Sequence, residues 1–199
     1  MRTILLVLVM SPLSSGAGLQ AQVDYTARVG VTWATALIRD VIVDEVEVQQ
    51  KLAPTLVLGA ALPIAPRYQA GLELALTSSG YRASETGTPT DLGTVRTGSV
   101  TLGLHGPVWR GVRWRVGGGL LRYWPSDAHG IFLSGGTTRF LAAAGVDYRH
   151  RVRPAWDLIF SLGYDLHRFT TAELQARGFS QSQGVQRVSA TVGLARGRP

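Results

Sequence analysis

Tyr68-Gln69-Ala70-Gly71-Leu72-Glu73-Leu74-Ala75-Leu76 is the stretch of sequence that decides the fold. Apolar residues occupy every second position, namely Tyr68, Ala70, Leu72, Leu74 and Leu76, and small or polar residues stand between them. Successive side chains of an extended chain point to opposite faces, so this alternation predicts a β-strand with one apolar face and one polar face.

The same alternation recurs seven more times along the chain. The eight expected strands cover approximately residues 25–34, 52–62, 68–77, 99–108, 113–124, 139–149, 156–167 and 185–195. Pro54 lies within the second of these, where it removes a donor from the hydrogen-bond ladder. We therefore expect Pro54 near the outer rim of the sheet, where a bulge is tolerable.

The connections between the expected strands alternate in length. Long connections cover residues 39–50, 79–94, 125–136 and 170–184, and short ones cover 63–67, 110–112 and 150–154. In the first long connection, residues 41–48 are acidic and alternate, which indicates an extension of the first hairpin. Transmembrane barrels have an even number of strands, short periplasmic turns and longer external loops. A soluble β-sandwich has no reason to sort its loops in this way.

The N-terminal segment has the three parts of a secretory signal peptide. Arg2 is followed by an unbroken apolar run at residues 4–10 and by a region of small residues that ends at Ala21. We expect cleavage after Ala21, with Ala17 as an alternative, so that residues 1–21 are the signal peptide and 22–199 the barrel domain. No later segment approaches 18 consecutive apolar residues, so no transmembrane helix is expected.

Composition supports a chain that exposes apolar surface to lipid. Hydrophobic residues make up 45% of the sequence and mean hydropathy is +0.12, which is unusual for a soluble protein with 24 glycines. The absence of cysteine means that the fold is held without disulfides. The formal net charge is +7, but no basic helix or aromatic-basic motif accompanies it. We therefore expect anionic lipid headgroups as partners and no nucleic acid.

Taken together, the signal peptide ending at Ala21, strands such as 68–76 and the loop parity resemble the small outer-membrane β-barrel family of the OmpA/OmpX type. The resemblance implies an all-β, eight-stranded antiparallel up-and-down transmembrane β-barrel in the bacterial outer membrane. It also implies insertion by the barrel-assembly machinery, and we expect a monomer. Members of the family usually end in a strand with a terminal aromatic residue that this machinery reads, and the last strand here, 185–195, lacks one.

Charged residues of both signs fall on the inward parity. An eight-stranded barrel is just wide enough to be filled by side chains, and unpaired charges there would be costly. We expect ion pairs of Glu73 with Arg28 or Arg115, and of Asp147 and Asp157 with Arg113, Arg115 or Arg149. The predicted lumen charge cluster comprises Arg28, Glu73, His105, Arg115, Arg139, Asp147, Asp157, Asp165, His167 and Arg187. It is interpreted as a plug, with a gate or narrow ion path as the alternative.

Aromatic residues flank the expected strands on the apolar face, as in the aromatic girdles of membrane barrels. The predicted membrane girdle comprises Tyr25, Trp33, Tyr68, Trp114, Trp124, Phe140, Tyr148, Trp156 and Tyr164. Arg122 shares the outward face near Trp124, and because arginine facing the middle of a bilayer is costly, it is expected at the outer rim. Arg122 and Arg96 are predicted contacts for lipopolysaccharide phosphates, with simple solvation of rim charges as the alternative.

Signatures of enzymes and metal sites are weak. The four histidines lack metal-ligand spacing, so no metal or cofactor is expected, although His105 and His167 are candidates to approach each other across the lumen. Gly117-Gly118-Gly119 is not followed by a Lys-Ser/Thr pair and does not indicate a phosphate loop. Some barrels of this size modify lipid A, and Asp127-Ala128-His129 is the nearest arrangement to their catalytic residues. We expect no enzymatic activity.

The sequence therefore predicts an outer-membrane, porin-like β-barrel with a structural or interaction role and a plugged lumen. Three alternatives remain: a narrow pore for ions or small solutes, a lipid-modifying outer-membrane enzyme, and a soluble lipocalin-like periplasmic barrel. In the last of these the larger apolar set would have to face inward.

Overall fold

The strands alternate between two faces as the sequence pattern requires. The computed structural model describes residues 23–35, 38–41, 45–85, 88–126, 136–170, 175 and 183–196, with the backbone alone described at 38–41, 45–49, 82–85 and 88–92. The expected signal peptide, 1–21, lies outside the described residues. The strands of the described chain are β1 (Asp24–Ala34), β2 (Ile38–Val41), β3 (Glu45–Gln50), β4 (Ala53–Ala65), β5 (Tyr68–Glu85), β6 (Thr88–Trp109), β7 (Val112–Pro125), β8 (Thr138–Arg153), β9 (Trp156–Phe169) and β10 (Gln183–Arg196).

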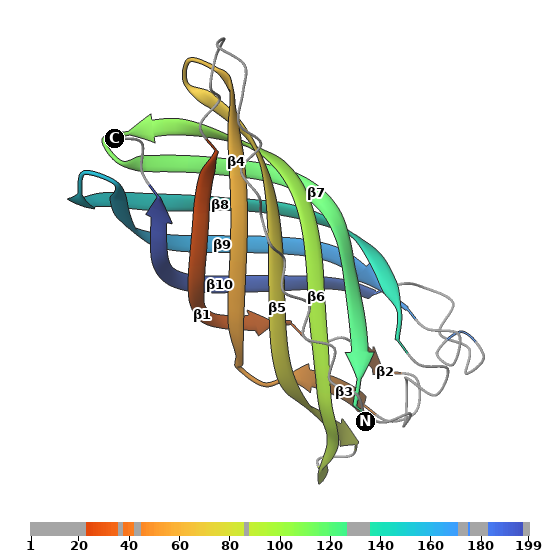
Figure 1. Cartoon of the computed structure of the whole chain (residues 1–199). Coiled ribbons are helices and arrows are strands. Elements are labelled where there is room, and N and C mark those ends of the chain that lie inside the picture. The colour runs from red at the N-terminus through yellow and green to blue at the C-terminus, as the bar shows by residue number, and fades with distance from the viewer. Residues whose placement is uncertain are drawn as a thin grey trace, which may run out of the picture.

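Eight of the described strands close into a ring of antiparallel neighbours. Each barrel strand pairs with the next along the chain, β5 with β6 among them, and β10 returns to pair with β1. Figure 1 shows the resulting tilted cylinder. The prediction of an eight-stranded up-and-down β-barrel is confirmed. In the part of the chain that the structure describes, no helix is long and apolar enough to cross a membrane.

The two ends of the cylinder differ. At one, which we call the short-turn end, β4 connects to β5, β6 to β7 and β8 to β9 through turns of two residues each. At the β6–β7 turn Gly111 has a φ of +80°, a left-handed conformation that favours glycine. The opposite end, where β1 ends and β4 begins, is the long-loop end.

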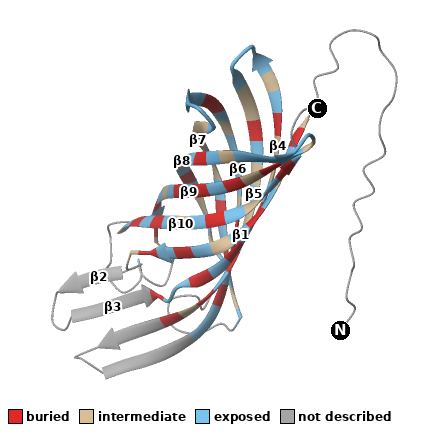
Figure 2. Ribbon diagram, turned by 90° about the vertical axis from the view of Figure 1, so that its left-hand side faces the viewer, coloured by how far each residue is buried: buried red, intermediate tan, exposed pale blue. Residues whose placement is uncertain are grey.

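Apolar side chains cover the outside of the barrel and polar ones fill its inside. Leu102 is 67% exposed and Phe140 is 85% exposed, whereas Arg28 is 2% exposed. Figure 2 shows exposed and buried residues alternating along the strands. This orientation is the reverse of what the soluble lipocalin-like alternative requires, because the larger apolar set faces outward.

Two predicted connections prove to be β-structure. Residues 79–94 were expected to be a long loop, but β5 and β6 continue pairing as far as Glu85 and Thr88. At the lower end of Figure 1, this hairpin reaches beyond the other barrel strands. Polar residues at both parities hid the extension, since a strand with water on both faces shows no apolar alternation.

The first long connection also differs from expectation. It forms a hairpin of its own, β2–β3, and β3 pairs with β5 from Val46↔Glu85 to Gln50↔Tyr81. It therefore does not extend the pairing of β1 with β4.

Pro54 lies near one end of β4, at a position without a bulge. Pro54 lies in regular register with Val31 at the long-loop end of β4, and the register of β4 shifts between Pro63 and Ala65 instead. Pro54 is tolerated because it stands one residue inside the strand end, before β4 begins to pair with β5.

Candidate functional site

The middle of the lumen holds a network of two arginines and two carboxylates. Arg28 forms an ion pair with Glu73 and a second, of 3.4 Å, with Asp147. Arg115 forms ion pairs of 3.4 Å with Glu73 and 3.0 Å with Asp147. Each guanidinium therefore contacts both carboxylates, and the four formal charges sum to zero.

Ser161 completes this network and ties in another strand. Its hydroxyl donates to Asp147 at 2.5 Å and accepts from Arg28 at 2.6 Å. The five residues come from β1, β5, β7, β8 and β9, so the contacts cross the lumen rather than following one pair of neighbouring strands. We call these five residues the central network.

Glycines make room for the central network. A Cβ on Gly145 would lie 2.5 Å from Nε of Arg115, closer than real side chains approach. A Cβ on Gly71 would lie 2.7 Å from Nε2 of His105 in the same way. The small residues on the inward parity of the strands are therefore what allows long polar side chains to lie across a narrow cylinder.

A second polar layer lies toward the long-loop end. Arg187 donates to the hydroxyls of Thr77 at 3.2 Å and Thr97 at 3.3 Å, across the ring from β10. Thr77, Thr55 and Thr32 are joined by hydrogen bonds of 3.1 and 2.6 Å. Hydrogen bonds in this layer therefore join neighbouring strands, through the threonines, and also opposite sides of the barrel, through Arg187.

Buried aromatic side chains lie in the lumen at this end. Tyr123 and His167 share a hydrogen bond of 2.6 Å, and the rings of Tyr123 and Phe169 meet edge-on with centroids 5.2 Å apart. Beyond them, the buried Tyr81 donates to Oε1 of Gln50 at 3.1 Å. Burial raises the pKa of Tyr81, so its phenol stays protonated and remains a donor.

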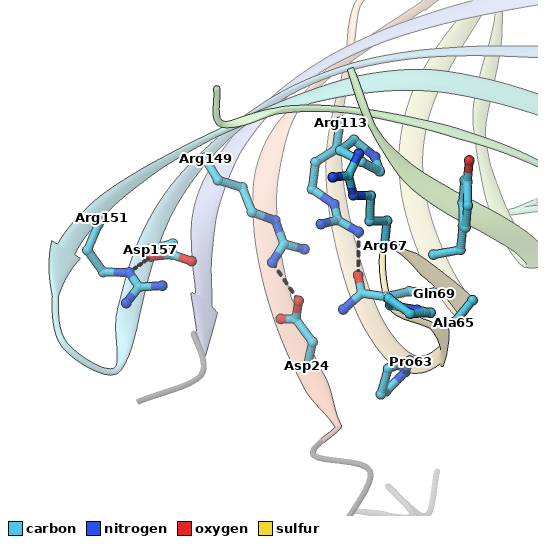
Figure 3. Close-up of a pocket in the computed structure, with 12 residues that line it drawn as sticks. Asp24, Pro63, Ala65, Arg67, Gln69, Arg113, Arg149, Arg151 and Asp157 are labelled. Carbon is cyan, nitrogen blue, oxygen red and sulfur yellow. Dashed lines mark hydrogen bonds and ion pairs between the residues drawn. The ribbon is translucent and has the colours of Figure 1, made fainter. Parts of the chain in front are cut away.

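The short-turn end opens into a cavity of about 470 Å³ that we call the basic vestibule. Figure 3 shows its paired side chains: Arg149 bonds Asp24 at 2.5 Å, Arg151 pairs with Asp157, and Arg113 donates to Gln69 at 2.8 Å. The residues that line it include four arginines and two aspartates, namely Arg67, Arg113, Arg149, Arg151, Asp24 and Asp157. An excess of positive charge therefore faces the solvent at this mouth.

Several predicted lumen residues lie where parity placed them but have other partners. Glu73 contacts both of its candidate arginines, and Asp147 contacts Arg115 as one of its candidates. Asp157 was expected to pair with Arg113, Arg115 or Arg149, and that expectation is wrong. It pairs instead with Arg151, its neighbour across the β8–β9 hairpin.

Five other predicted residues stay out of the central network. Asp165 is the cross-strand neighbour of Arg187, whose described hydrogen bonds are with threonines. Arg139 donates to the backbone carbonyl of Thr170. His105 lies against Gly71 near mid-barrel and His167 bonds Tyr123, so the two histidines have different neighbours and do not form a pair across the lumen.

Sequence reasoning missed other residues of the lumen, among them Asp24, Tyr81 and Phe169. All three have the same parity as predicted inward residues on their own strands: Asp24 with Arg28, Tyr81 with Glu73, and Phe169 with His167. The signal was present, but the expected strands ended before reaching them.

Two cavities beside the central network have volumes of about 20 and 10 Å³, lined in part by Glu73, His105 and Arg115 in one and by Arg28, Asp147 and Arg149 in the other. A water molecule needs about 10–15 Å³ measured in this way. Each cavity therefore has room for about one water.

The nine aromatic residues of the predicted girdle all lie on the outside of the barrel. Tyr68 and Trp114 form a tilted pair near the short-turn end, with ring centroids 6.3 Å apart. The others are exposed, and they are Tyr25, Trp33, Trp124, Phe140, Tyr148, Trp156 and Tyr164. Arg96 and Arg122 are also exposed, on neighbouring strands at the long-loop end.

Among the described residues, no group of three or more histidine, aspartate or glutamate side chains could hold a metal ion. The Asp127-Ala128-His129 arrangement, the nearest to a lipid A-modifying enzyme, lies outside the described residues. The lumen as described can bind charge and fill space.

Comparison with solved structures identifies the same architecture elsewhere. The crystal structure of Neisserial surface protein A (NspA) matches with a TM-score of 0.56 and 10% sequence identity, over 87% of this chain and 96% of that one. The solid-state NMR structure of the outer membrane protein AlkL in DMPC lipid bilayers matches with a TM-score of 0.52 and 13% identity, over 94% of this chain and 95% of that one. No protein-family model and no curated protein matches the sequence. At these identities the shared property is the fold.

Proposed function

We propose that this chain, which has the eight-stranded fold of small outer-membrane proteins, spans the bacterial outer membrane as a plugged barrel with a structural or interaction role. The apolar exterior and the aromatic residues at both of its edges support the location. In this arrangement the short-turn end faces the periplasm and the long-loop end faces outward.

The central network is the observation that supports a plug. It joins five of the eight barrel strands across the lumen, and its charges balance. A conducted ion would have to displace guanidinium–carboxylate contacts, and leaving either partner buried and unpaired costs about 3–5 kcal/mol. The small mid-lumen cavities agree with this interpretation.

Single-channel recording in planar lipid bilayers tests the plug. The wild-type protein, folded from detergent and checked by its heat-modifiable gel mobility, is expected to give no steady conductance steps. A variant carrying both Arg28→Ala and Glu73→Ala keeps the net charge, removes one side of the central network and is expected to conduct. Steady steps from the wild type at moderate voltage would favour the narrow-pore alternative instead.

A further inference from the structure

The outer surface of β6 and β7 carries a side-chain arrangement that depends on one glycine. A Cβ on Gly98 would lie 2.6 Å from the ring of Trp124 and 3.3 Å from Leu76, so the indole lies directly over the glycine backbone. The guanidinium of Arg122 stands over the same indole, 5.8 Å from its ring centre. Trp124 thereby contacts both the Gly98 backbone and Arg122, while 42% of its surface stays exposed.

Two arginines flank this tryptophan at the long-loop end. Arg96 is the cross-strand partner of Trp124, and Arg122 is the partner of Gly98, so the two arginines lie on a diagonal of one exposed face. Diagonal neighbours on a sheet are about 7–8 Å apart, within reach of two long side chains that bind one group. Among the described residues, no carboxylate forms an ion pair with either of them.

Two apolar grooves run along the outside of the barrel beneath these arginines. One, of about 490 Å³, has Arg96 on its rim, and the other, of about 450 Å³, has Arg122. Leu56, Leu76 and Trp124 line both grooves. Each groove is therefore lined by apolar side chains and by one arginine.

We propose that this surface binds a phosphorylated, multiply acylated lipid of the lipid A type. Arg96 and Arg122 hold the phosphate, and acyl chains lie in the two grooves on either side of Trp124. The inference rests on the proposed function, because it needs the long-loop end to face the outer leaflet.

Charge complementarity selects this occupant over an ordinary phospholipid. Arginine binds phosphate through parallel hydrogen bonds, and stacking on an indole fixes the guanidinium in advance. A zwitterionic headgroup would bring its own cation toward two arginines, whereas a phosphomonoester brings negative charge alone. A lipid with several chains also fills both grooves at once.

Lipid binding is measured by native mass spectrometry of the folded full-length chain in detergent, titrated with diphosphoryl lipid A or with phosphatidylcholine. The variant with both Arg96→Gln and Arg122→Gln is expected to bind lipid A at least about ten-fold more weakly, which is the loss of one or two charge-assisted hydrogen bonds. Gly98→Ala keeps both arginines but displaces the indole, and is expected to weaken binding as well. Arg168→Gln is the matched control, because Arg168 is an exposed arginine at the same end of β9 and lies outside both grooves.

The inference is overturned if phosphatidylcholine binds wild type as tightly as lipid A, since the grooves alone would then explain binding. It is also overturned if the double variant is unchanged, if Arg168→Gln weakens binding as much as the double variant does, or if the surface binds a second copy of the chain in preference to lipid. Each variant is checked by heat-modifiable mobility, and the wild-type titrations need no variant at all. Wild type that inserts into bilayers but does not prefer lipid A refutes the lipid site and leaves the proposed function standing. Failure to insert refutes both.

Discussion

Asp147 is the residue on which the centre of the barrel depends most directly. It is buried, it forms ion pairs with Arg28 and Arg115, and it accepts from Ser161. Removing its charge leaves two guanidiniums in contact with the single carboxylate of Glu73. The cost arises from a buried cation without compensation rather than from the loss of one contact.

Asp147→Asn is therefore expected to lower the free energy of unfolding by about 3–5 kcal/mol. Asp157→Asn is the matched control, because Asp157 is also buried but its partner Arg151 has a side chain that is 55% exposed, so the expected loss is about 0–1 kcal/mol. Urea unfolding in lipid vesicles, followed by tryptophan fluorescence, measures both variants. Equal losses in the two variants would mean that the ion pairs of Asp147 contribute no more to stability than the ion pair of Asp157 with Arg151.

At the scale of elements, strand identity was predictable and strand length was not. Alternation in stretches such as 68–76 identified all eight barrel strands, because each has one face toward an apolar environment. No apolar alternation in the sequence marks the extension of β5 to Glu85 and of β6 from Thr88. The same is true of the pairing of β3 with β5. The partners in the ion pairs were equally hard to predict. Parity shows that a side chain points into the lumen, but it does not show at which level along the barrel axis the guanidinium of a long arginine lies.

The β2–β3 hairpin protects the projecting part of β5. Arg82 pairs with Gln49 on one side and Asp91 on the other, so its backbone is held in a three-stranded sheet. Replacing residues 38–49 with a short Gly-Ser linker leaves the eight barrel strands intact, and the heat-modifiable mobility should persist. Limited trypsin digestion after Arg82 is expected to become at least about ten-fold faster, because local opening then breaks fewer ladder bonds. Cleavage after Arg110, in the β6–β7 turn, serves as the internal reference and should not change.

For the whole molecule, the decisive property is that the apolar face points away from the lumen. Leu102 lies on the outside of β6 opposite Gly118, which is near the middle of β7, and Val108 lies on the same face next to the short-turn end. In a bilayer, Leu102→Arg is expected to cost about 2–4 kcal/mol of folding free energy and Val108→Arg about 0–1 kcal/mol. Guanidinium unfolding in phospholipid vesicles measures the difference. Two equally small effects would indicate that water, not hydrocarbon, surrounds the barrel.

The pairing of β1 with β10 affects how the barrel folds. Thr26 pairs with Ala195, so the first barrel strand is completed by the last one along the chain. Contacts between such distant segments carry a large loop-closure entropy and form slowly. Until β1 and β10 pair, the unfinished barrel has two unpaired strand edges, and any other strand could pair with them. Slow folding and wrong strand pairing are therefore concentrated at the final step, when the barrel closes. A chaperone that shields both strand edges would accelerate folding most at this step.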